Sequence, residues 1–215
     1  MARNRFQNLD PDKQEAILQA AGEEFAEKGF EAASINRIIS RSGLSKGSVY
    51  YYFEDKADLF ATVMERGTQR LMGEIGWPAL EVIGPDEFWD ALMELTHRSM
   101  ELVQRDDWWI RMGRAFHHLR HESTGAGGEA IRRLTEMGRG MWRTLIQRGQ
   151  ALGVVRTDLP LDLLVEITMG ADEGGDRWMV ERWDTLSPEE LKTIVDGRVD
   201  LLRDMLDKKN EGWER

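Results

Sequence analysis

The stretch of sequence that decides the fold is Ser34–Lys56, which reads S-I-N-R-I-I-S-R-S-G-L-S-K-G-S-V-Y-Y-Y-F-E-D-K. Ser34 is a common helix-capping residue, and the isoleucines that follow it fall on one face of a short helix. The turn Ser42-Gly43-Leu44 then ends this helix, and Ser45 begins a second short helix that we expect to end near Phe53. Two short helices joined by a turn that contains glycine are typical of a helix-turn-helix.

Longer helices are predicted on both sides of this segment. The one before it covers about residues 11–28, with a proline in its opening turn and apolar residues along one stripe, and Gly29 ends it. On the other side, Asp55 and Asp58 are spaced like a capping box. This spacing predicts a helix over about residues 56–75, which would follow the second short helix directly.

The second short helix carries side chains that suit a polyanion. Its first turn combines free backbone N–H groups with a lysine, two hydroxyls and a glycine that lets the backbone approach closely. These residues are Ser45, Lys46, Gly47 and Ser48. The chain's three tyrosines follow as Tyr50, Tyr51 and Tyr52. Because three consecutive phenols cannot all face one small core, at least one or two hydroxyls should reach the surface.

Charge is unevenly distributed along the chain. With 29 basic and 39 acidic residues the net charge is −10, but residues 1–53 hold seven of each and are neutral. The acidic excess therefore lies in residues 54–215. Within the neutral part, Ser34–Phe53 contains three basic residues and no carboxylate, and such a locally cationic surface on an acidic body can approach a polyanion in one orientation only. Val49 and Phe53 are expected in the core, whereas for Tyr52 core packing and phosphate contact stay equally open.

At these residues the chain resembles the tetracycline-repressor (TetR) family of bacterial transcription regulators. The family signature, roughly I-A-x-x-A-G-V-S-x-G-x-x-Y-x-[HY]-F-x-x-K-x-x-L, is matched over Ile38–Leu59, with Ile39 and Ser42 where alanine is usual. The resemblance implies that Ser45, Lys46, Gly47 and Ser48 lie in the major groove of DNA. It implies DNA-backbone contacts by Ser34, Arg37, Tyr50, Tyr51, Tyr52 and Lys56. Arg3 and Arg5 would add a flexible arm along the duplex.

The rest of the chain is predicted to form a larger helical domain over residues 56–215, behind an N-terminal DNA-binding domain over residues 1–55. Strand-like alternation is essentially absent, so we expect an all-α fold with about nine helices. Ser123–Gly128 has the composition of a loop. The amphipathic helices of this domain are expected over about residues 86–103, 107–121, 131–152, 161–182 and 188–207.

The resemblance also places an effector site inside the larger domain. All eight tryptophans lie beyond residue 76, and tryptophan and methionine make adaptable walls for flat or apolar molecules. If Asp172 or Asp176 is buried beside tryptophan, a lipophilic cation is a natural effector, whereas exposure of these carboxylates to solvent is the alternative. Burial in an ordinary core is the alternative for each apolar residue. The candidates are Trp89, Met93, Met100, Trp108, Trp109, Met112, Phe116, Met141, Trp142, Leu145, Asp172, Asp176, Trp178 and Met179.

The resemblance further implies a homodimer on a palindromic operator, in which the last two helices of each subunit pair across the two-fold axis. Gly170, Gly174 and Gly175 would allow close approach of helices, or equally mark a kink. Effector binding would displace the helix over residues 56–75 and so release the operator. We therefore expect a ligand-responsive repressor. The alternative is an architectural DNA-binding protein without an effector.

Other classes of protein have little support in the sequence. Cysteine is absent, which excludes disulfides and thiolate metal sites, and the nucleophile and nucleotide-binding motifs of common enzymes are missing. In the cluster His117, His118 and His121, the first and last could chelate an ion from one helical face, but beyond Glu122 no further ligand is nearby. We therefore predict no metal and no cofactor, and favour a pH-sensitive hinge or plain exposure for these histidines. No apolar run is long enough for a membrane span and no signal sequence is apparent, so we expect a cytoplasmic protein.

Overall fold

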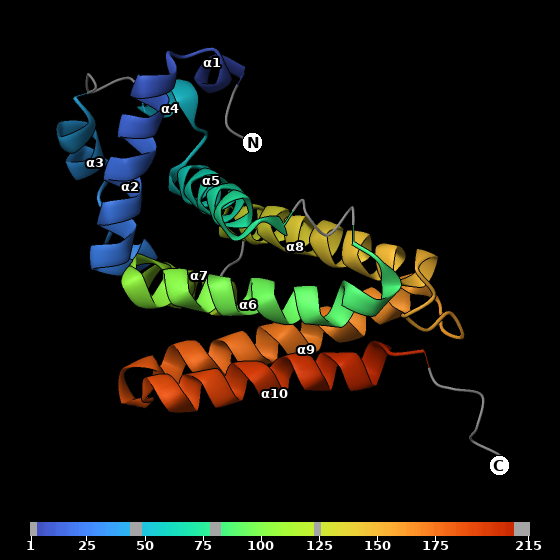
Figure 1. Cartoon of the computed structure of the whole chain (residues 1–215). Coiled ribbons are helices and arrows are strands. Elements are labelled where there is room, and N and C mark those ends of the chain that lie inside the picture. Colours follow the sequence, from blue (N-terminus) through green and yellow to red (C-terminus); the bar gives the residue numbers. More distant parts are fainter. Residues whose placement is uncertain (1–3, 44–48, 78–82, 123–125, 209–215) are drawn as a thin grey trace. The chain divides into compact units, whose positions relative to one another are not determined.

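The computed structural model describes residues 4–43, 49–77, 83–122 and 126–208. The α-helices are α1 (Asn4–Gln7), α2 (Pro11–Ala32), α3 (Ile35–Ser42), α4 (Val49–Tyr52), α5 (Lys56–Ile75), α6 (Phe88–Arg105), α7 (Trp108–Glu122), α8 (Ala126–Ala151), α9 (Leu161–Arg182) and α10 (Pro188–Leu206). Two 3-10 helices, η2 (Pro85–Glu87) and η3 (Trp183–Thr185), precede α6 and follow α9. The all-α prediction is confirmed, and the described residues hold ten α-helices because the short α1 precedes the helices that the sequence predicts (Figure 1).

Local chemistry explains where the first helices begin and end. The Asp10 carboxylate accepts hydrogen bonds from two N–H groups in the first turn of α2. Gly29 adopts a φ of 70° and interrupts the helical path as predicted, although a further turn continues to Ala32. Gly43, also with a φ of 70°, ends α3. Both positions favour glycine because side-chain-bearing residues rarely adopt this left-handed conformation.

The turn before α5 follows the predicted capping pattern with one change of partner. The N–H of Asp58 donates to Asp55 Oδ1 at 2.8 Å. The Asp58 carboxylate accepts in return from the N–H of Glu54, at 3.1 Å, rather than from that of Asp55. The helix then covers the predicted residues 56–75.

The later helices lie close to their predicted ranges. α9 covers residues 161–182, and α10 begins behind Ser187, whose hydroxyl accepts from the N–H of Glu190 in a capping box. The loop predicted over Ser123–Gly128 is wrong at its end, because α8 already begins at Ala126. The error arises because a helix can begin with the same small residues, such as glycine and alanine, that are typical of loops.

The chain divides into two compact units, of which the first comprises residues 1–70 and 106–136. In this unit α2 packs against α3 and α7 around buried aromatic rings. A Cβ on Gly67 of α5 would lie 3.0 Å from the ring of Trp108, so the indole of α7 fits closely against this glycine. The helix-turn-helix thus shares its core with α7.

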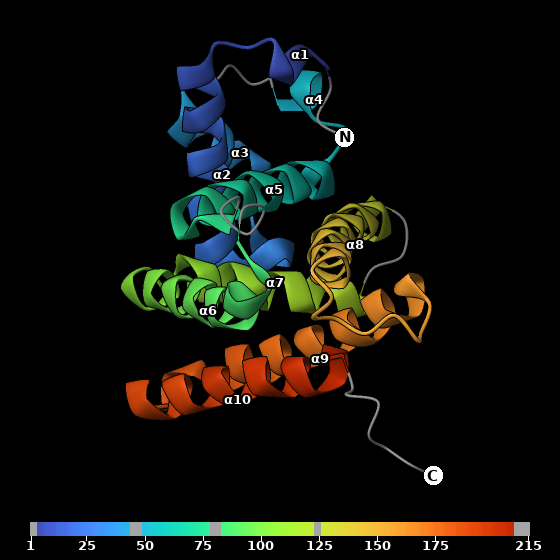
Figure 2. The same cartoon turned by 45° about the vertical axis from the view of Figure 1, so that its right-hand side comes forward.

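The second unit comprises residues 71–105 and 137–215. Here α10 lies beside both α6 and α9 (Figures 1 and 2). The larger core of the second unit combines buried residues of several helices, among them Phe88, Ile146 and Val165. None of the helices in the described residues has the length and apolar character that crossing a membrane requires.

Candidate nucleic-acid interface and effector residues

The tyrosines of α4 divide between surface and core. Tyr50 and Tyr51 are 58% and 49% exposed, whereas Tyr52 is half-buried. Val49 and Phe53 are buried, because residues four positions apart share one face of a helix. The expectations that these two residues belong to the core and that at least one phenol lies at the surface are confirmed.

The N-terminal segment lies against α4. Phe6 packs on Phe53 with ring centroids 4.8 Å apart, and the Arg5 guanidinium lies 4.4 Å from the ring centroid of Tyr51. The prediction of a flexible arm is wrong for Arg5, which belongs to α1, since burial of Phe6 anchors this helix. Arg3 lies outside the described residues. Arg5 therefore adds a cation beside the exposed tyrosines.

The residues predicted to read the major groove lie just before α4. Ser45, Lys46, Gly47 and Ser48 fall outside the described residues, as does Leu44. Their proposed contacts therefore rest on the sequence and on the two ends of the segment. Those ends are Gly43, which closes α3, and Val49, which is buried at the start of α4.

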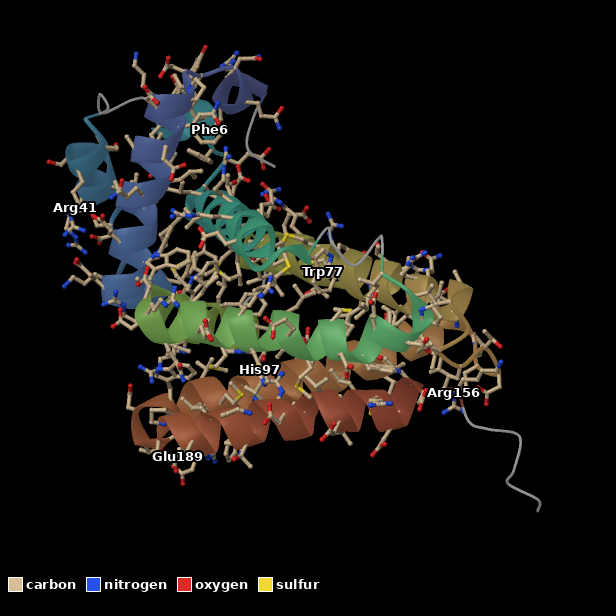
Figure 3. The ribbon with its side chains drawn as sticks, viewed as in Figure 1. Phe6, Arg41, Trp77, His97, Arg156 and Glu189 are labelled. Atoms are coloured by element: carbon tan, nitrogen blue, oxygen red, sulfur yellow. The ribbon has the colours of Figure 1, made fainter. Side chains whose placement is uncertain are left out.

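A buried carboxylate that the sequence interpretation missed connects α2 to α3. Glu24 is fully buried, and its Oε1 accepts from the N–H of Ser34 at 2.9 Å and from Arg37 Nε at 2.8 Å. Arg41, labelled in Figure 3, approaches Glu24 Oε2 to 3.7 Å and pairs with Glu27 at 3.3 Å. The hydrogen bond from Arg37 holds the pKa of Glu24 below its ordinary value of 4.5, against the opposing effect of burial. The Ser34 hydroxyl makes no capping hydrogen bond, so the predicted side-chain cap is wrong.

Two of the predicted phosphate contacts have partners within the protein. Besides its carboxylate partner, the Arg37 guanidinium donates to the carbonyl oxygen of Ala32 at 3.1 Å. Lys56 Nζ donates to the carbonyl oxygen of Glu31 at 2.9 Å and lies 4.6 Å from the ring centroid of Phe30. Both cations therefore satisfy carbonyl groups at the end of α2, and their contact with phosphate stays a prediction.

The predicted effector residues divide between the two compact units. Those in the first unit are Trp108, Trp109, Met112 and Phe116. Those in the second unit are Trp89, Met93, Met100, Met141, Trp142, Leu145, Asp172, Asp176, Trp178 and Met179. Helical periodicity predicts that a residue is buried but not which core receives it, so the sequence could not separate the two groups.

Within the second unit the apolar candidates join two cores. Trp89, Trp142 and Leu145 belong to the larger one, and Met100 and Met179 to a smaller one that involves α10. The Trp89 indole Nε1 is buried and has no hydrogen-bond partner among the described residues. A buried indole normally donates a hydrogen bond, so Trp89 is an exception to this rule within the described residues.

One face of α9 exposes apolar side chains and glycines. Leu163, Ile167 and Trp178 are exposed, so Trp178 faces solvent rather than an interior pocket. Gly170 and Gly174 lie between them at spacings of three or four residues, and a Cβ on either glycine would meet nothing within 4 Å. The row therefore forms an open apolar surface along one helix.

The candidate acids Asp172 and Asp176 share one cation, Arg198 of α10. Arg198 Nη2 donates to Asp172 Oδ1 at 2.8 Å and to Asp176 Oδ1 at 2.7 Å. A Cβ on Gly175 would lie 2.6 Å from Arg198 Nε, so this glycine serves close approach, and α9 is one helix there. Desolvation and the charge of Asp176 raise the pKa of Asp172 to about 7, although Arg198 and a hydrogen bond from Trp142 favour the charged form.

The histidines do not gather with other ligands in the part of the chain that the structure describes. No group of three or more His, Asp or Glu side chains in that part could hold a metal ion, and the side chain of His121 lies outside it. His97 instead joins α6 to α10, with Nε2 2.5 Å from Asp196 Oδ1 (Figure 3). Hydrogen bonds from Lys192 and His97 hold the pKa of Asp196 below its ordinary value.

Comparison with known proteins identifies the N-terminal part of the chain. The sequence profile of bacterial regulatory proteins of the tetR family matches residues 17–63. The chain is similar to the uncharacterized HTH-type transcriptional regulator YvdT of Bacillus subtilis, with 32% identity over 43% of this chain and 46% of YvdT. It is also similar to the HTH-type transcriptional repressor AcnR of Corynebacterium glutamicum, with 25% identity over 71% of this chain and 74% of AcnR. The match therefore spans less than half of the first relative and about three quarters of the second.

Solved structures share the fold over most of the chain. FadR from Bacillus subtilis, a transcriptional regulator in complex with stearoyl-CoA, matches with a TM-score of 0.69 and 17% identity, over 89% of this chain and 98% of FadR. The fatty acid degradation regulator FadR from Bacillus halodurans also has a TM-score of 0.69, with 19% identity over 94% of this chain and 99% of that protein. The helix-turn-helix, its sequence signature and the profile match agree that residues 17–63 are similar to the DNA-binding part of the tetR family of bacterial regulatory proteins, and the solved structures show that the rest of the chain shares their fold.

Proposed function

We propose that the chain is a homodimeric transcriptional repressor that binds a palindromic operator in the bacterial cytoplasm and releases it when a small hydrophobic effector binds. The observation that carries DNA binding is the exposure of Tyr50 and Tyr51 on a short helix whose other face is buried through Val49 and Phe53. Phenol hydroxyls so presented can donate to phosphates, while the buried face fixes the helix. We divide the functions between DNA binding in residues 1–55 and effector binding and dimerisation in residues 56–215.

The proposed DNA contacts are of two kinds. Base edges in the major groove would be read from the turn that enters α4, by Ser45, Lys46, Gly47 and Ser48. The remaining contacts would hold the DNA backbone and set the register of the protein on the duplex. We propose for them Ser34, Arg37, Tyr50, Tyr51, Tyr52 and Lys56, together with Arg5, whose guanidinium lies over Tyr51.

The proposed dimer interface is the open face of α9 with the adjoining α10. Leu163, Ile167 and Trp178 form an exposed apolar row on α9, and Leu201 is exposed on α10. Exposed apolar rows of this kind are commonly covered by a partner, and a second copy of the same face gives a closed two-fold pair. A dimer of this kind would carry two reading helices and hence favour a palindromic operator.

The proposed effector is a small hydrophobic molecule bound in the second unit. The solved FadR of Bacillus subtilis holds stearoyl-CoA, which supports an apolar effector class in this fold. In this chain the buried Trp89, whose indole N–H has no hydrogen-bond partner among the described residues, and Trp142 belong to one core. A cationic group on the effector would compete with Arg198 for Asp172, and a panel of cationic and anionic hydrophobic compounds tests that preference by tryptophan fluorescence.

The experiment that tests the proposed function is selection of bound DNA from random duplexes by the purified protein. A repressor of this kind enriches one palindromic sequence, with half-sites spaced about one helical turn apart or a multiple of it. If the protein enriches no sequence, the proposed operator binding is wrong. If it enriches an asymmetric site, the proposed dimer on a palindromic operator is wrong. Thermal unfolding against a metabolite library then separates an effector-responsive repressor from an architectural protein, which no small molecule should stabilise.

A further inference from the structure

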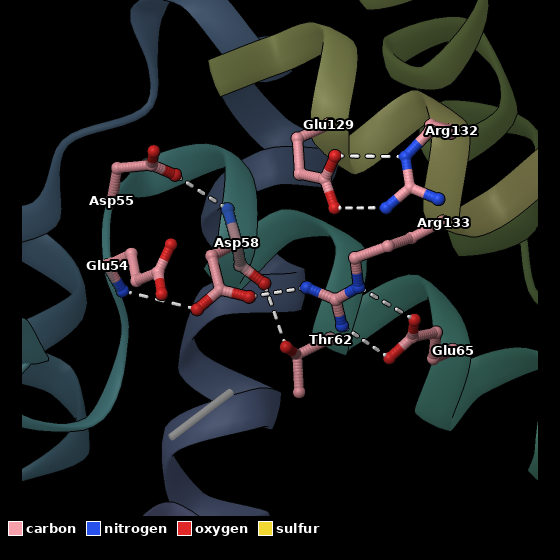
Figure 4. A network of polar contacts seen from close by, with 8 residues as sticks. All are labelled: Glu54, Asp55, Asp58, Thr62, Glu65, Glu129, Arg132 and Arg133. Carbon is pink, nitrogen blue, oxygen red and sulfur yellow. Dashed lines mark hydrogen bonds and ion pairs between the residues drawn. The ribbon is translucent and has the colours of Figure 1, made fainter. Parts of the chain in front are cut away.

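Arg133 of α8 forms a buried charged contact within the first unit that the proposed function does not use. Its guanidinium donates to Asp58 Oδ1 through Nη1 and to both carboxylate oxygens of Glu65 through Nε and Nη2, the latter at 3.2 and 2.7 Å (Figure 4). The Arg133 side chain is only 12% exposed and that of Asp58 6%. Buried bidentate pairs of this kind fix geometry more strongly than exposed ion pairs.

Asp58 joins this contact to the end of the DNA-reading segment. One carboxylate oxygen accepts from Arg133, and the other accepts from the backbone N–H of Glu54 at 3.1 Å. Glu54 follows Phe53, whose own N–H donates to the carbonyl oxygen of Val49 in the first residue of α4. A single carboxylate thus links α8 to the turn by which the chain leaves α4 (Figure 4).

The neighbouring Arg132 provides a natural contrast. It is 62% exposed and pairs with Glu129 on its own helix, at 2.6 and 3.0 Å. Exposed pairs between positions three residues apart contribute little to stability. Of these two adjacent arginines on α8, Arg133 therefore contacts α5, whereas Arg132 pairs within its own helix (Figure 4).

α8 is the helix that extends from the first compact unit into the second. Its residues 126–136 belong to the first unit and residues 137–151 to the second, where Trp142 and Leu145 join the larger core. A continuous helix is a stiff element, so a shift or rotation at one end moves side chains at the other. Arg133 lies three residues before the boundary between the units.

We infer that Arg133 is the positioning residue through which α8 holds the DNA-reading segment in its operator-binding arrangement, by way of Asp58 and the N–H of Glu54. The inference rests on the proposed function, since it concerns operator binding. Displacement of α8 by an effector would withdraw Arg133 from Asp58. Loss of this charge-assisted contact would make the position of the Asp58 carboxylate less fixed, and with it the turn after α4.

The test compares R133Q with R132Q in the whole 215-residue chain by two readouts. The first is amide hydrogen exchange at Glu54, measured without DNA, and the second is affinity for the duplex obtained by selection, at fixed salt. R133Q should exchange this amide about tenfold faster, because the acceptor is no longer held. It should also bind the duplex about tenfold more weakly, inside the range of about 5- to 150-fold that coupling between sites usually spans. R132Q should change neither readout.

Each other outcome overturns the inference. Unchanged exchange at Glu54 in R133Q would show that Arg133 does not hold the turn. Faster exchange with unchanged duplex affinity would show that the turn does not position the reading segment. Failure of the wild-type protein to enrich any duplex would instead refute the proposed function, and the inference with it. If R133Q does not fold, R133K replaces it with R132K as control, because one ammonium group cannot reproduce the bidentate contact.

Discussion

Two carboxylate clusters, one in each compact unit, balance charge in opposite ways. In the first unit the fully buried Glu24 has two cations, Arg37 and Arg41, and a backbone N–H, and its pKa is lowered. In the second unit Asp172 and Asp176 share the single cation Arg198, and the pKa of Asp172 is raised to about 7.

The two clusters should therefore differ in whether their charge can change. A carboxylate with more than one cation stays charged at every physiological pH and holds α2 to α3 permanently. Carboxylates that outnumber their cation can take up a proton, or another cation, at little cost. We therefore expect the helix-turn-helix scaffold to be rigid and the acidic cluster of α9 to respond to its surroundings.

The largest effect is expected from E24Q. The amide keeps the shape of the side chain but loses the charge-assisted hydrogen bonds to Ser34 and Arg37, so the free energy of unfolding should fall by about 3 kcal/mol. Urea unfolding measures it. E27Q is the matched control, because Glu27 is exposed and pairs only with Arg41 in the contacts described above. Equal unfolding free energies for the two variants would show that the buried carboxylate of Glu24 does not hold α2 to α3.

R198M tests the second cluster. Without the guanidinium, Asp172 and Asp176 repel each other, and at about pH 8 the free energy of unfolding should fall by about 2 kcal/mol. At about pH 5 the loss should be smaller, since Asp172 can take up a proton in the folded state. Urea midpoints at the two pH values measure the difference. A loss that is independent of pH would mean that the cluster is as fixed as the one around Glu24.

The pH dependence of stability should have opposite signs at the two sites. The raised pKa of Asp172 means that the folded state holds this proton more tightly, so its contribution is present below 3.8 and is lost as pH rises through about 7. The lowered pKa of Glu24 gives a contribution that is present above 4.5 and is lost as pH falls through the folded-state value. Thermal unfolding of D172N and E24Q across pH measures both slopes. D172N should lack the loss near neutrality, and a wild-type slope in that variant would assign it elsewhere.

The smallest effect is expected from R41A. Its nearest atom lies 3.7 Å from Glu24 and its side chain is more than a third exposed, so the unfolding free energy should change by about 0.5 kcal/mol or less. The same urea measurement with R37A should give a larger loss, because Arg37 donates directly to the buried carboxylate. An R41A loss as large as that of R37A would show that both cations are required.

Local sequence signals predicted much of the fold and the exposed part of the candidate interface. Helix caps, glycine stops and apolar periods gave the ranges of α5 and α9, and the period of α4 explained why Tyr50 and Tyr51 are exposed. The sequence did not reveal the roles of Glu24 and Arg198, although each lies among residues of a buried helix face. Glu24 falls between the buried Ala21 and Phe25, and Arg198 precedes the buried Val199. A charged residue in such a register signals a buried ion pair, but its partner comes from another helix and no local pattern names it.

Other features had no local signal at all. Arg132 and Arg133 are adjacent and chemically identical, and only tertiary contact distinguishes the buried one. The division of the effector candidates between two units has the same cause, because a helical stripe of Trp and Met fits any core. The short α1 forms because Phe6 is buried against Phe53, a contact between distant parts of the chain.

The most direct test of the central claim is the affinity of K46A for the selected duplex over a range of salt concentrations, beside the control K192A. Lys192 is exposed on α10 and pairs with Asp196, which contacts His97 of α6 and is not part of the exposed apolar row proposed for the dimer, so its loss should leave operator binding unchanged. K46A should bind more weakly, and the slope of log affinity against log salt should fall by up to about one unit, as expected for loss of one phosphate contact. Identical affinity and slope for K46A and the wild-type protein would contradict a DNA-reading surface at this segment.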